Sequence, residues 1–134
     1  MKKKSKNISK ISVEQKKGKD FWGPPVWTSL HIFSATFKSE NAQAYITFLH
    51  TLTFLIPCDE CKTHFKEILQ ILPINSYLTN NHDCFFLSYI IHDMVNENAT
   101  KHHPEVPPKE SPNYDEIKAY YFNSLYQECK ECQL

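Results

Sequence analysis

The chain has 134 residues, of which 41% are hydrophobic and 13% aromatic, so it can bury one core and is most simply a single domain. Its formal net charge is zero, and all 15 basic residues are lysines. Because base readout and phosphate clamping rely on the planar guanidinium of arginine, the composition argues against a nucleic-acid reader. Only two glycines occur, which disfavours a glycine-rich phosphate loop or a many-stranded β-sandwich and favours a helical bundle.

The charge is unevenly distributed along the chain. Residues 1–19 contain eight lysines against the single acid Glu14, a net charge of +7, so the remainder carries −7. Such a run predicts a disordered, solvated arm. No apolar block follows it, so no secretory signal is expected, and no apolar stretch approaches the ~20 residues that span a bilayer. We expect the Lys-rich arm over 1–19, a helical domain over 20–127 and a tail over 128–134.

The first two predicted helices follow a proline turn. Phe21-Trp22-Gly23-Pro24-Pro25 reads as a turn, and the apolar residues after it recur at helical spacing to about Phe37. Asn41 can cap a second helix. This helix should end before Pro57, because a residue that precedes proline is pushed out of the α region.

A Cys-x-x-Cys motif opens the third predicted helix, which runs from Cys58 to about Leu72. Thiols at i and i+3 share a helix face and are close enough to bridge. Cys58 falls in the first turn, where free N–H groups favour a thiolate, whereas Cys61 begins the apolar stripe and should point inward. The same spacing is half of a structural zinc site, so the motif alone is evenly compatible with redox chemistry and zinc binding.

The fourth predicted helix, from about Asp83 to Asn98, is apolar nearly all round in its first half, as expected of the most buried helix. An irregular, proline-rich loop over 101–112 follows it. Asn113 and Glu116 then resemble a capping box that opens a fifth helix.

Two polar pairs at i, i+4 lie beside these apolar stripes. Trp27 and His31 lie on the first helix, where core packing is the simplest interpretation of both. His92 and Asn96 lie on the fourth helix, where placement at the surface competes with binding of a ligand. Leaving such a group buried and unpaired would cost roughly 1–3 kcal/mol, so the pairs need partners.

Together these motifs resemble the Erv/ALR family of FAD-linked sulfhydryl oxidases. The resemblance rests on Trp27-x-x-x-His31, Pro57-Cys58-x-x-Cys61, and His92-x-x-x-Asn96 followed by Lys101, in that order over roughly residues 20–125. It implies an all-α fold, a four-helix bundle with a short fifth helix, that holds FAD within the bundle. It also implies that Cys58 and Cys61 are catalytic and that FAD contacts Trp27, His31, Ile56, His92, Asn96, Lys101 and Tyr120, or Tyr121 in place of the last.

The resemblance further implies a reaction. A substrate thiolate attacks Cys58 and releases Cys61, whose electrons pass through FAD to oxygen and give hydrogen peroxide. Cys129 and Cys132, on the tail, resemble shuttle cysteines that relay oxidising equivalents to dithiol proteins, in relatives often across a homodimer. The composition is similar to that of compact viral members of the family. If the protein is viral, we expect it in the host cytoplasm or the virion; if it is not, we expect it in the mitochondrial intermembrane space.

The sequence also departs from the family pattern. Many relatives have a second disulfide between the third and fourth helices, but Tyr89 takes the fourth-helix position here and Cys84 has no obvious partner. Asp93 replaces the usual asparagine beside the histidine. The main alternative is a non-enzymatic zinc module that uses both Cys-x-x-Cys pairs, although almost the whole domain separates them. A flavin-free thioredoxin-like carrier would need a βαβ pattern that the sequence lacks.

Overall fold

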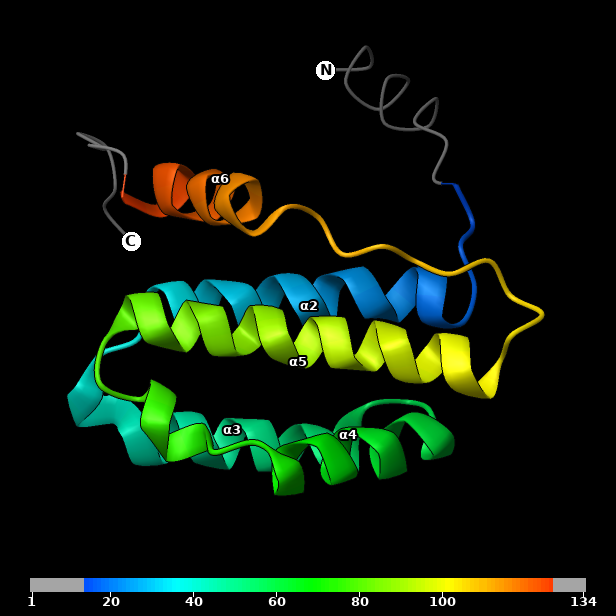
Figure 1. The fold of residues 1–134 in the computed structure, drawn as a ribbon, viewed down its shortest axis with the longest axis horizontal. Helices are drawn as coiled ribbons and strands as arrows, with labels where there is room; N and C mark the ends of the chain where they lie inside the picture. Colours follow the sequence, from blue (N-terminus) through cyan, green and yellow to red (C-terminus); the bar gives the residue numbers. More distant parts are fainter. Residues whose placement is uncertain (1–13, 127–134) are drawn as a thin grey trace, which may run out of the picture.

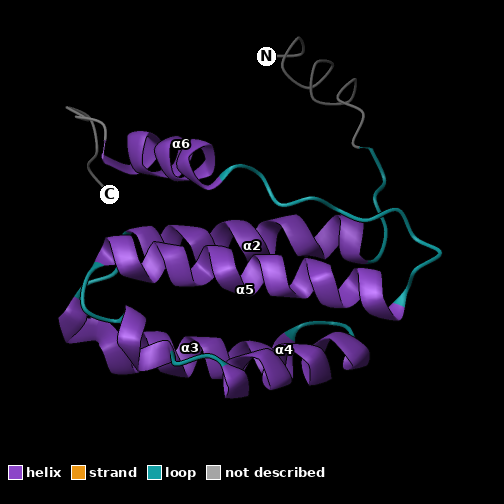
Figure 2. Ribbon diagram, in the orientation of Figure 1, coloured by secondary structure: helices purple, strands orange, loops and turns teal. Residues whose placement is uncertain are grey.

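The computed structural model describes residues 14–126, in which every regular element is helical (Figures 1 and 2). Its α-helices are, in chain order, α2 (Lys19–Ala35), α3 (Ala42–Leu55), α4 (Asp59–Ile71), α5 (Asn81–His102) and α6 (Tyr114–Tyr126). Two short 3-10 helices, η1 (Ser39–Asn41) and η2 (Ile74–Tyr77), lie in the connections. The predicted all-α fold is therefore confirmed. None of the helices within this range is long and apolar enough to cross a membrane.

The helices are arranged in three layers (Figure 1). Helices α2 and α5 run side by side in opposite directions, and α3 and α4 form a second antiparallel pair next to them. Helix α4 also packs against α5, which closes a four-helix bundle. Helix α6 lies on the other side of the α2–α5 pair and contacts α2, so this pair is covered on both faces.

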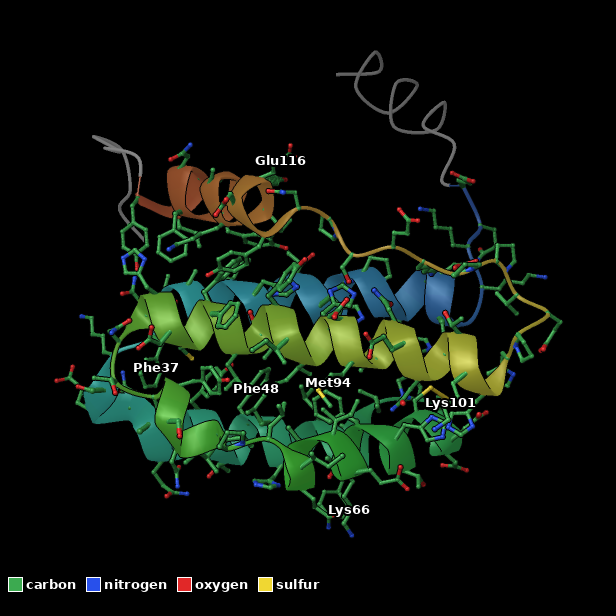
Figure 3. All side chains as sticks on the ribbon, viewed as in Figure 1. Phe37, Phe48, Lys66, Met94, Lys101 and Glu116 are labelled. Atoms are coloured by element: carbon green, nitrogen blue, oxygen red, sulfur yellow. A yellow bond between two sulfur atoms is a disulfide. The ribbon has the colours of Figure 1, made fainter. Side chains whose placement is uncertain are left out.

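The hydrophobic core fills the space between the two helix pairs. Its most deeply buried side chains come from all four helices of the bundle: Leu30, Leu49, Ile68, Leu87 and Ile91. Phe85 is equally buried, but its ring packs against His31 of α2 and against Tyr121 and Phe122 of α6. Removing each such side chain from water contributes about 1.5–3 kcal/mol. In Figure 3, Phe48 and Met94 point into this space from α3 and α5, whereas Lys66 points outward from α4.

Helix α2 begins at Lys19 and contains Pro24 and Pro25, so the predicted start after the proline pair is wrong. Gly18 has a φ of 58°, which glycine adopts without steric penalty, and its carbonyl accepts two hydrogen bonds from the first helical turn. The prolines remove two N–H donors from the second turn. The residues four positions before them are exposed, so water can replace the lost donors.

Helix α5 is longer at both ends than predicted. The Asn80 side chain accepts a hydrogen bond from the Asp83 N–H at 2.9 Å and so caps the helix at an earlier point. At the other end the helix continues to His102, so Lys101 lies on the last turn and not in a loop. Cationic side chains are favoured there because the helix C-terminus carries partial negative charge. The irregular connection to α6 is correspondingly shorter and covers 103–113 (Figure 2).

The predicted caps have different outcomes. Asn113 accepts a hydrogen bond from the Glu116 N–H at 3.1 Å, as expected. Asn41 does occupy the N-cap position of α3, but its side chain makes no capping hydrogen bond. Residues 1–13 of the predicted arm, together with Cys129 and Cys132 of the tail, lie outside the described residues, and the domain limits stay a prediction.

Candidate active site

The turn between α3 and α4 carries a disulfide between Cys58 and Cys61, with their Cα atoms 5.2 Å apart. Ile56 ends α3 in extended backbone, Pro57 lies in a bend closed by a 2.9 Å hydrogen bond from the Cys58 N–H to the Ile56 carbonyl, and Cys58 then takes the N-cap position of α4. The N–H of Cys61 donates to Cys58 Sγ at 3.2 Å. A helix N-terminus that aims an N–H at a sulfur stabilises negative charge on it. Both cysteines are half-buried, and Cys61 packs against the hydrophobic core.

Acidic side chains flank the disulfide on its solvent side. Asp59 is exposed, and Glu60 accepts a hydrogen bond from His103 Nε2 at 2.9 Å. This hydrogen bond holds the pKa of the Glu60 carboxyl below its usual value. Because His103 directly follows α5, the contact joins the start of α4 to the end of α5. Lys101, on the last turn of α5, is exposed near the same end of the bundle (Figure 3).

A cluster of four rings lies where α2, α5 and α6 meet. Trp27 stacks on His92 with ring centroids 3.8 Å apart and an interplanar angle of 10°. His31 lies 5.4 Å from His92, and Tyr121 lies 5.3 Å from His31, again between ring centroids. The structure thus brings together three of the predicted cofactor residues, from positions far apart in the chain, in what we call the ring cluster (Trp27, His31, His92 and Tyr121).

Hydrogen bonds connect the two histidines of the ring cluster to a buried serine. His31 Nδ1 lies 2.9 Å from Ser88 Oγ, and His31 Nε2 lies 3.2 Å from His92 Nδ1. Ser88 Oγ in turn donates to the Phe85 carbonyl at 2.6 Å. The predicted need for polar partners on these helices is met in this way. The sequence interpretation did not use Ser88, although it was the one small hydroxyl residue in an otherwise apolar stretch of α5.

Both histidines are neutral at pH 7. Burial, reinforced by the adjacent His92 ring, lowers the pKa of His31 to about 4. Burial also lowers the pKa of His92 to about 4, where the opposing influence of Asp93 is weaker than the loss of solvent. The ring cluster therefore presents uncharged aromatic faces and ring nitrogens to a ligand.

The remaining predicted cofactor residues are spread around this centre. Ile56 is buried in the core directly before the disulfide turn. Asn96 lies one helical turn beyond His92, and its side chain donates weakly to Ser111 Oγ at 3.5 Å. Tyr120 is 61% exposed, whereas its neighbour Tyr121 joins the ring cluster. Tyr121 is thus the tyrosine of α6 that lies in the ring cluster. The rotation of α6 about its axis, which the sequence left open, determines that Tyr121 and not Tyr120 faces α2.

The other cysteine of the described region is shielded from this chemistry. Cys84 is fully buried, and burial raises the pKa of its thiol to about 11. Within residues 14–126, no group of three or more histidine, cysteine and acidic side chains is arranged to hold a metal ion. Two of the four sulfurs that the zinc alternative requires are joined to each other in the disulfide.

A surface cavity of about 700 Å³ lies elsewhere, between the start of α5 and α6. It is lined by Asn81, His82, Phe122, Asn123 and Tyr126, none of which was a predicted site residue. It lies at the opposite end of α5 from the disulfide turn (Figure 1). The candidate site is therefore defined by the disulfide and the ring cluster, and not by this cavity.

The fold and these motifs agree with a comparison against protein families. The model of the Erv1 / Alr family matches residues 24–116, more than half of the chain. The chain belongs to this family.

Two curated viral proteins are similar to about three-fifths of this chain. "Putative FAD-linked sulfhydryl oxidase 088R" of Frog virus 3 (isolate Goorha) is 30% identical over 93 residues, which cover 64% of this chain and 61% of that protein. "Putative FAD-linked sulfhydryl oxidase 096R" of Invertebrate iridescent virus 3 is 23% identical over 84 residues, which cover 60% of this chain and 57% of that protein. The chain thus spans about three-fifths of the length of these relatives. No solved structure matches it.

Proposed function

We propose that this chain is an FAD-dependent thiol oxidase that forms disulfide bonds in dithiol substrates and reduces oxygen to hydrogen peroxide. The observation that carries the proposal is the Cys58–Cys61 disulfide at the N-terminus of α4, packed on the same bundle that holds the ring cluster. The names of the two viral relatives support FAD as the cofactor and the oxidation of sulfhydryl groups. The viral sources of these relatives support a viral origin. We further propose the host cytoplasm or the virion as the place of action.

The thiol chemistry follows from the local structure of the turn. A substrate thiolate attacks Cys58 Sγ, a mixed disulfide forms, and Cys61 leaves as a thiolate. The second thiolate of the substrate then attacks the substrate sulfur of the mixed disulfide and releases Cys58 as a thiolate. The N–H of Cys61 stabilises this thiolate. The substrate gains a disulfide, and the enzyme holds two thiols and the two electrons of the substrate.

The ring cluster matches the chemistry of the cofactor. Half-buried aromatic faces can stack on flat heteroaromatic rings, and neutral histidine nitrogens can accept hydrogen bonds from N–H and O–H groups. Trp27, His31, His92 and Tyr121 would supply these contacts, with Asn96 and Lys101 further along α5 for the ribose and phosphates. FAD, when bound, would supply a two-electron acceptor for the reduced cysteine pair and a route for these electrons to oxygen. The role of the ring cluster would be to hold the flat rings of FAD and to exclude water from them.

We also propose that Cys129 and Cys132 shuttle electrons between bulky substrates and the disulfide of a second copy of the chain. Tyr126 Oη donates to the Ala35 carbonyl at 2.7 Å and accepts from Asn81 Nδ2 at 3.3 Å, so the end of α6 lies at the start of α5. The disulfide turn lies at the other end of α5, about 30 Å away at 1.5 Å per residue. Cys132 follows Tyr126 by six positions, a reach of at most ~20 Å. This comparison supports transfer within a homodimer.

The first test is the colour and activity of the purified full chain. We expect a yellow protein with a bound-flavin spectrum, which consumes oxygen and produces peroxide when dithiothreitol is added. The Cys61→Ser variant should keep the flavin spectrum and lose turnover, because no disulfide can form. A colourless protein that releases zinc to a chelator, or unchanged turnover in Cys61→Ser, would overturn the proposal.

The shuttle is tested with the double variant Cys129→Ser/Cys132→Ser. We expect oxidation of a reduced protein substrate to fall about ten-fold or more, with oxidation of dithiothreitol nearly unchanged, because a small dithiol reaches Cys58 directly. Mixing this variant with Cys58→Ser/Cys61→Ser subunits should restore protein oxidation if the transfer is between copies. Equal losses on both substrates would remove the shuttle role.

A further inference from the structure

The hydrogen bonds of the ring cluster have a direction that Ser88 determines. The Ser88 hydroxyl carries one proton, and a backbone carbonyl can only accept, so the 2.6 Å contact with the Phe85 oxygen uses that proton. Ser88 Oγ can therefore only accept from the other side. His31 Nδ1, 2.9 Å away, must be the donor in that contact.

The assignment of this proton fixes the tautomers of both histidines. A neutral imidazole has one N–H, so His31 with its proton on Nδ1 presents Nε2 as an acceptor. His92 Nδ1 lies 3.2 Å from that atom and must carry the proton of the His92 ring. His92 Nε2 is then left as an acceptor. The chain of donors runs from His92 through His31 and Ser88 to the Phe85 carbonyl.

The outer end of this series of hydrogen bonds, His92 Nε2, is available to a ligand. No group within residues 14–126 is hydrogen bonded to His92 Nε2. Because every fully buried side-chain nitrogen and oxygen in that range has a hydrogen-bond partner, His92 Nε2 is accessible to solvent. Stacking on Trp27, with the rings 10° from parallel, holds the plane of the His92 ring. The lowered pKa of each histidine keeps both rings neutral, which the tautomer argument requires.

We propose that Ser88 is a positioning residue, which orients the His31–His92 hydrogen bonds so that His92 Nε2 accepts from an N–H or O–H donor group of bound FAD. The FAD part of this inference rests on the proposed function. Ser88 itself is fully buried and acts through His31. Without its hydroxyl the two rings can reverse their shared hydrogen bond, and His92 would then present an N–H where the ligand offers a donor of its own.

The direct test is histidine tautomer assignment by long-range ¹H–¹⁵N NMR on the full chain without added FAD. In the wild-type protein at pH 7 we expect both His31 and His92 to be protonated at Nδ1. In Ser88→Ala we expect His92 to move wholly or partly to the form protonated at Nε2. Ser88→Thr keeps the hydroxyl and should restore the wild-type form. His92 protonated at Nε2 in the wild type, or unchanged tautomers in Ser88→Ala, would overturn the positioning role.

The consequence for FAD is tested by titration, with a matched control in the same bundle. Ser34 is also fully buried, donates to a helix carbonyl at 2.7 Å and contacts Tyr45 Oη, but within residues 14–126 it has no hydrogen bond to the ring cluster. We expect Ser88→Ala to weaken FAD binding about ten-fold, about 1.4 kcal/mol, and Ser34→Ala to leave it within two-fold at a similar loss of thermal stability. Equal weakening in both variants would overturn the inference, because a general loss of stability would then explain it.

The two proposals fail in different ways. A wild-type chain that binds no FAD overturns the proposed function and the FAD half of this inference together. Unchanged tautomers in Ser88→Ala overturn the role of Ser88 alone, because that measurement needs no cofactor.

Discussion

The disulfide turn and the ring cluster are built from different kinds of contact. Cys58 and Cys61 are three positions apart, half-buried, and flanked by an exposed carboxylate at Asp59. In the ring cluster, His31 is hydrogen bonded to partners 57 and 61 positions away, deep between two helices. The disulfide itself therefore joins two residues of a single helix start, whereas the ring cluster depends on the packing of three helices. Mutations and pH should separate the two.

The largest loss of stability should come from Phe85→Ala, which removes a ring packed against the ring cluster. Phe85 is fully buried and contacts His31, Tyr121 and Phe122 with ring centroids 5.4–5.7 Å apart. We expect this change to lower the free energy of unfolding by about 3–5 kcal/mol, because a core phenylalanine leaves a cavity. Urea unfolding measures the loss. The Cys58–Cys61 disulfide should still form in the folded fraction, as thiol counting can show.

The neighbouring Phe86 provides the control for this variant, since it is 39% exposed on the same helix. Phe86→Ala should cost clearly less than Phe85→Ala and leave FAD binding intact. Similar losses of stability in the two variants would contradict the burial of Phe85 against the ring cluster.

The second largest effect should be a loss of stability at acidic pH, caused by the two histidines of the ring cluster. The pKa of each histidine is lowered to about 4 in the folded protein, so the unfolded chain takes up protons first as the pH falls below 6.5. Stability contributed by the neutral rings is thus present above pH 6.5 and is lost as the pH falls toward 4. Between pH 7.5 and 5 we expect a loss of about 2 kcal/mol for His31, and less for the more exposed His92.

The pH prediction is checked by urea unfolding at pH 7.5 and pH 5. The His31→Gln variant should lose less stability between these two conditions than the wild type does. His50→Gln, which removes an exposed histidine of α3, should behave like the wild type. An identical pH dependence in all three proteins would show that His31 does not titrate with a lowered pKa.

The smallest effect is expected at the disulfide turn. Asp59 is exposed, and the one ion pair it forms within residues 14–126, with Lys62, is a surface contact of 3.4 Å within one helical turn. Asp59→Asn should change the free energy of unfolding by no more than about 0.5 kcal/mol. The rate of dithiothreitol oxidation should rise by a few-fold at most, because one negative charge next to the thiolates is removed. A large loss of stability would mean that the turn is not as local as its contacts indicate.

The helical register explains which predictions from the sequence succeeded. Periodic apolar positions located the helices, and the i, i+3 spacing of Cys58 and Cys61 is itself a statement about distance, because both lie on one helix turn. The helix ends were less predictable. Gly18, with a φ of 58°, directly precedes the start of α2, and His103, which contacts Glu60, directly follows the end of α5. Neither feature is visible in a pattern of apolar residues.

The sequence by itself determined the all-helical class, the paired cysteines at a helix start and the polar pairs on two helix faces, since each depends on neighbours within one or two turns. Only the tertiary structure decided that Ser88 faces His31, that His31 faces His92, and that Tyr121 rather than Tyr120 reaches them. These contacts depend on how α2, α5 and α6 rotate and slide against one another. Packing of the whole core sets that rotation, and no single segment contains the information.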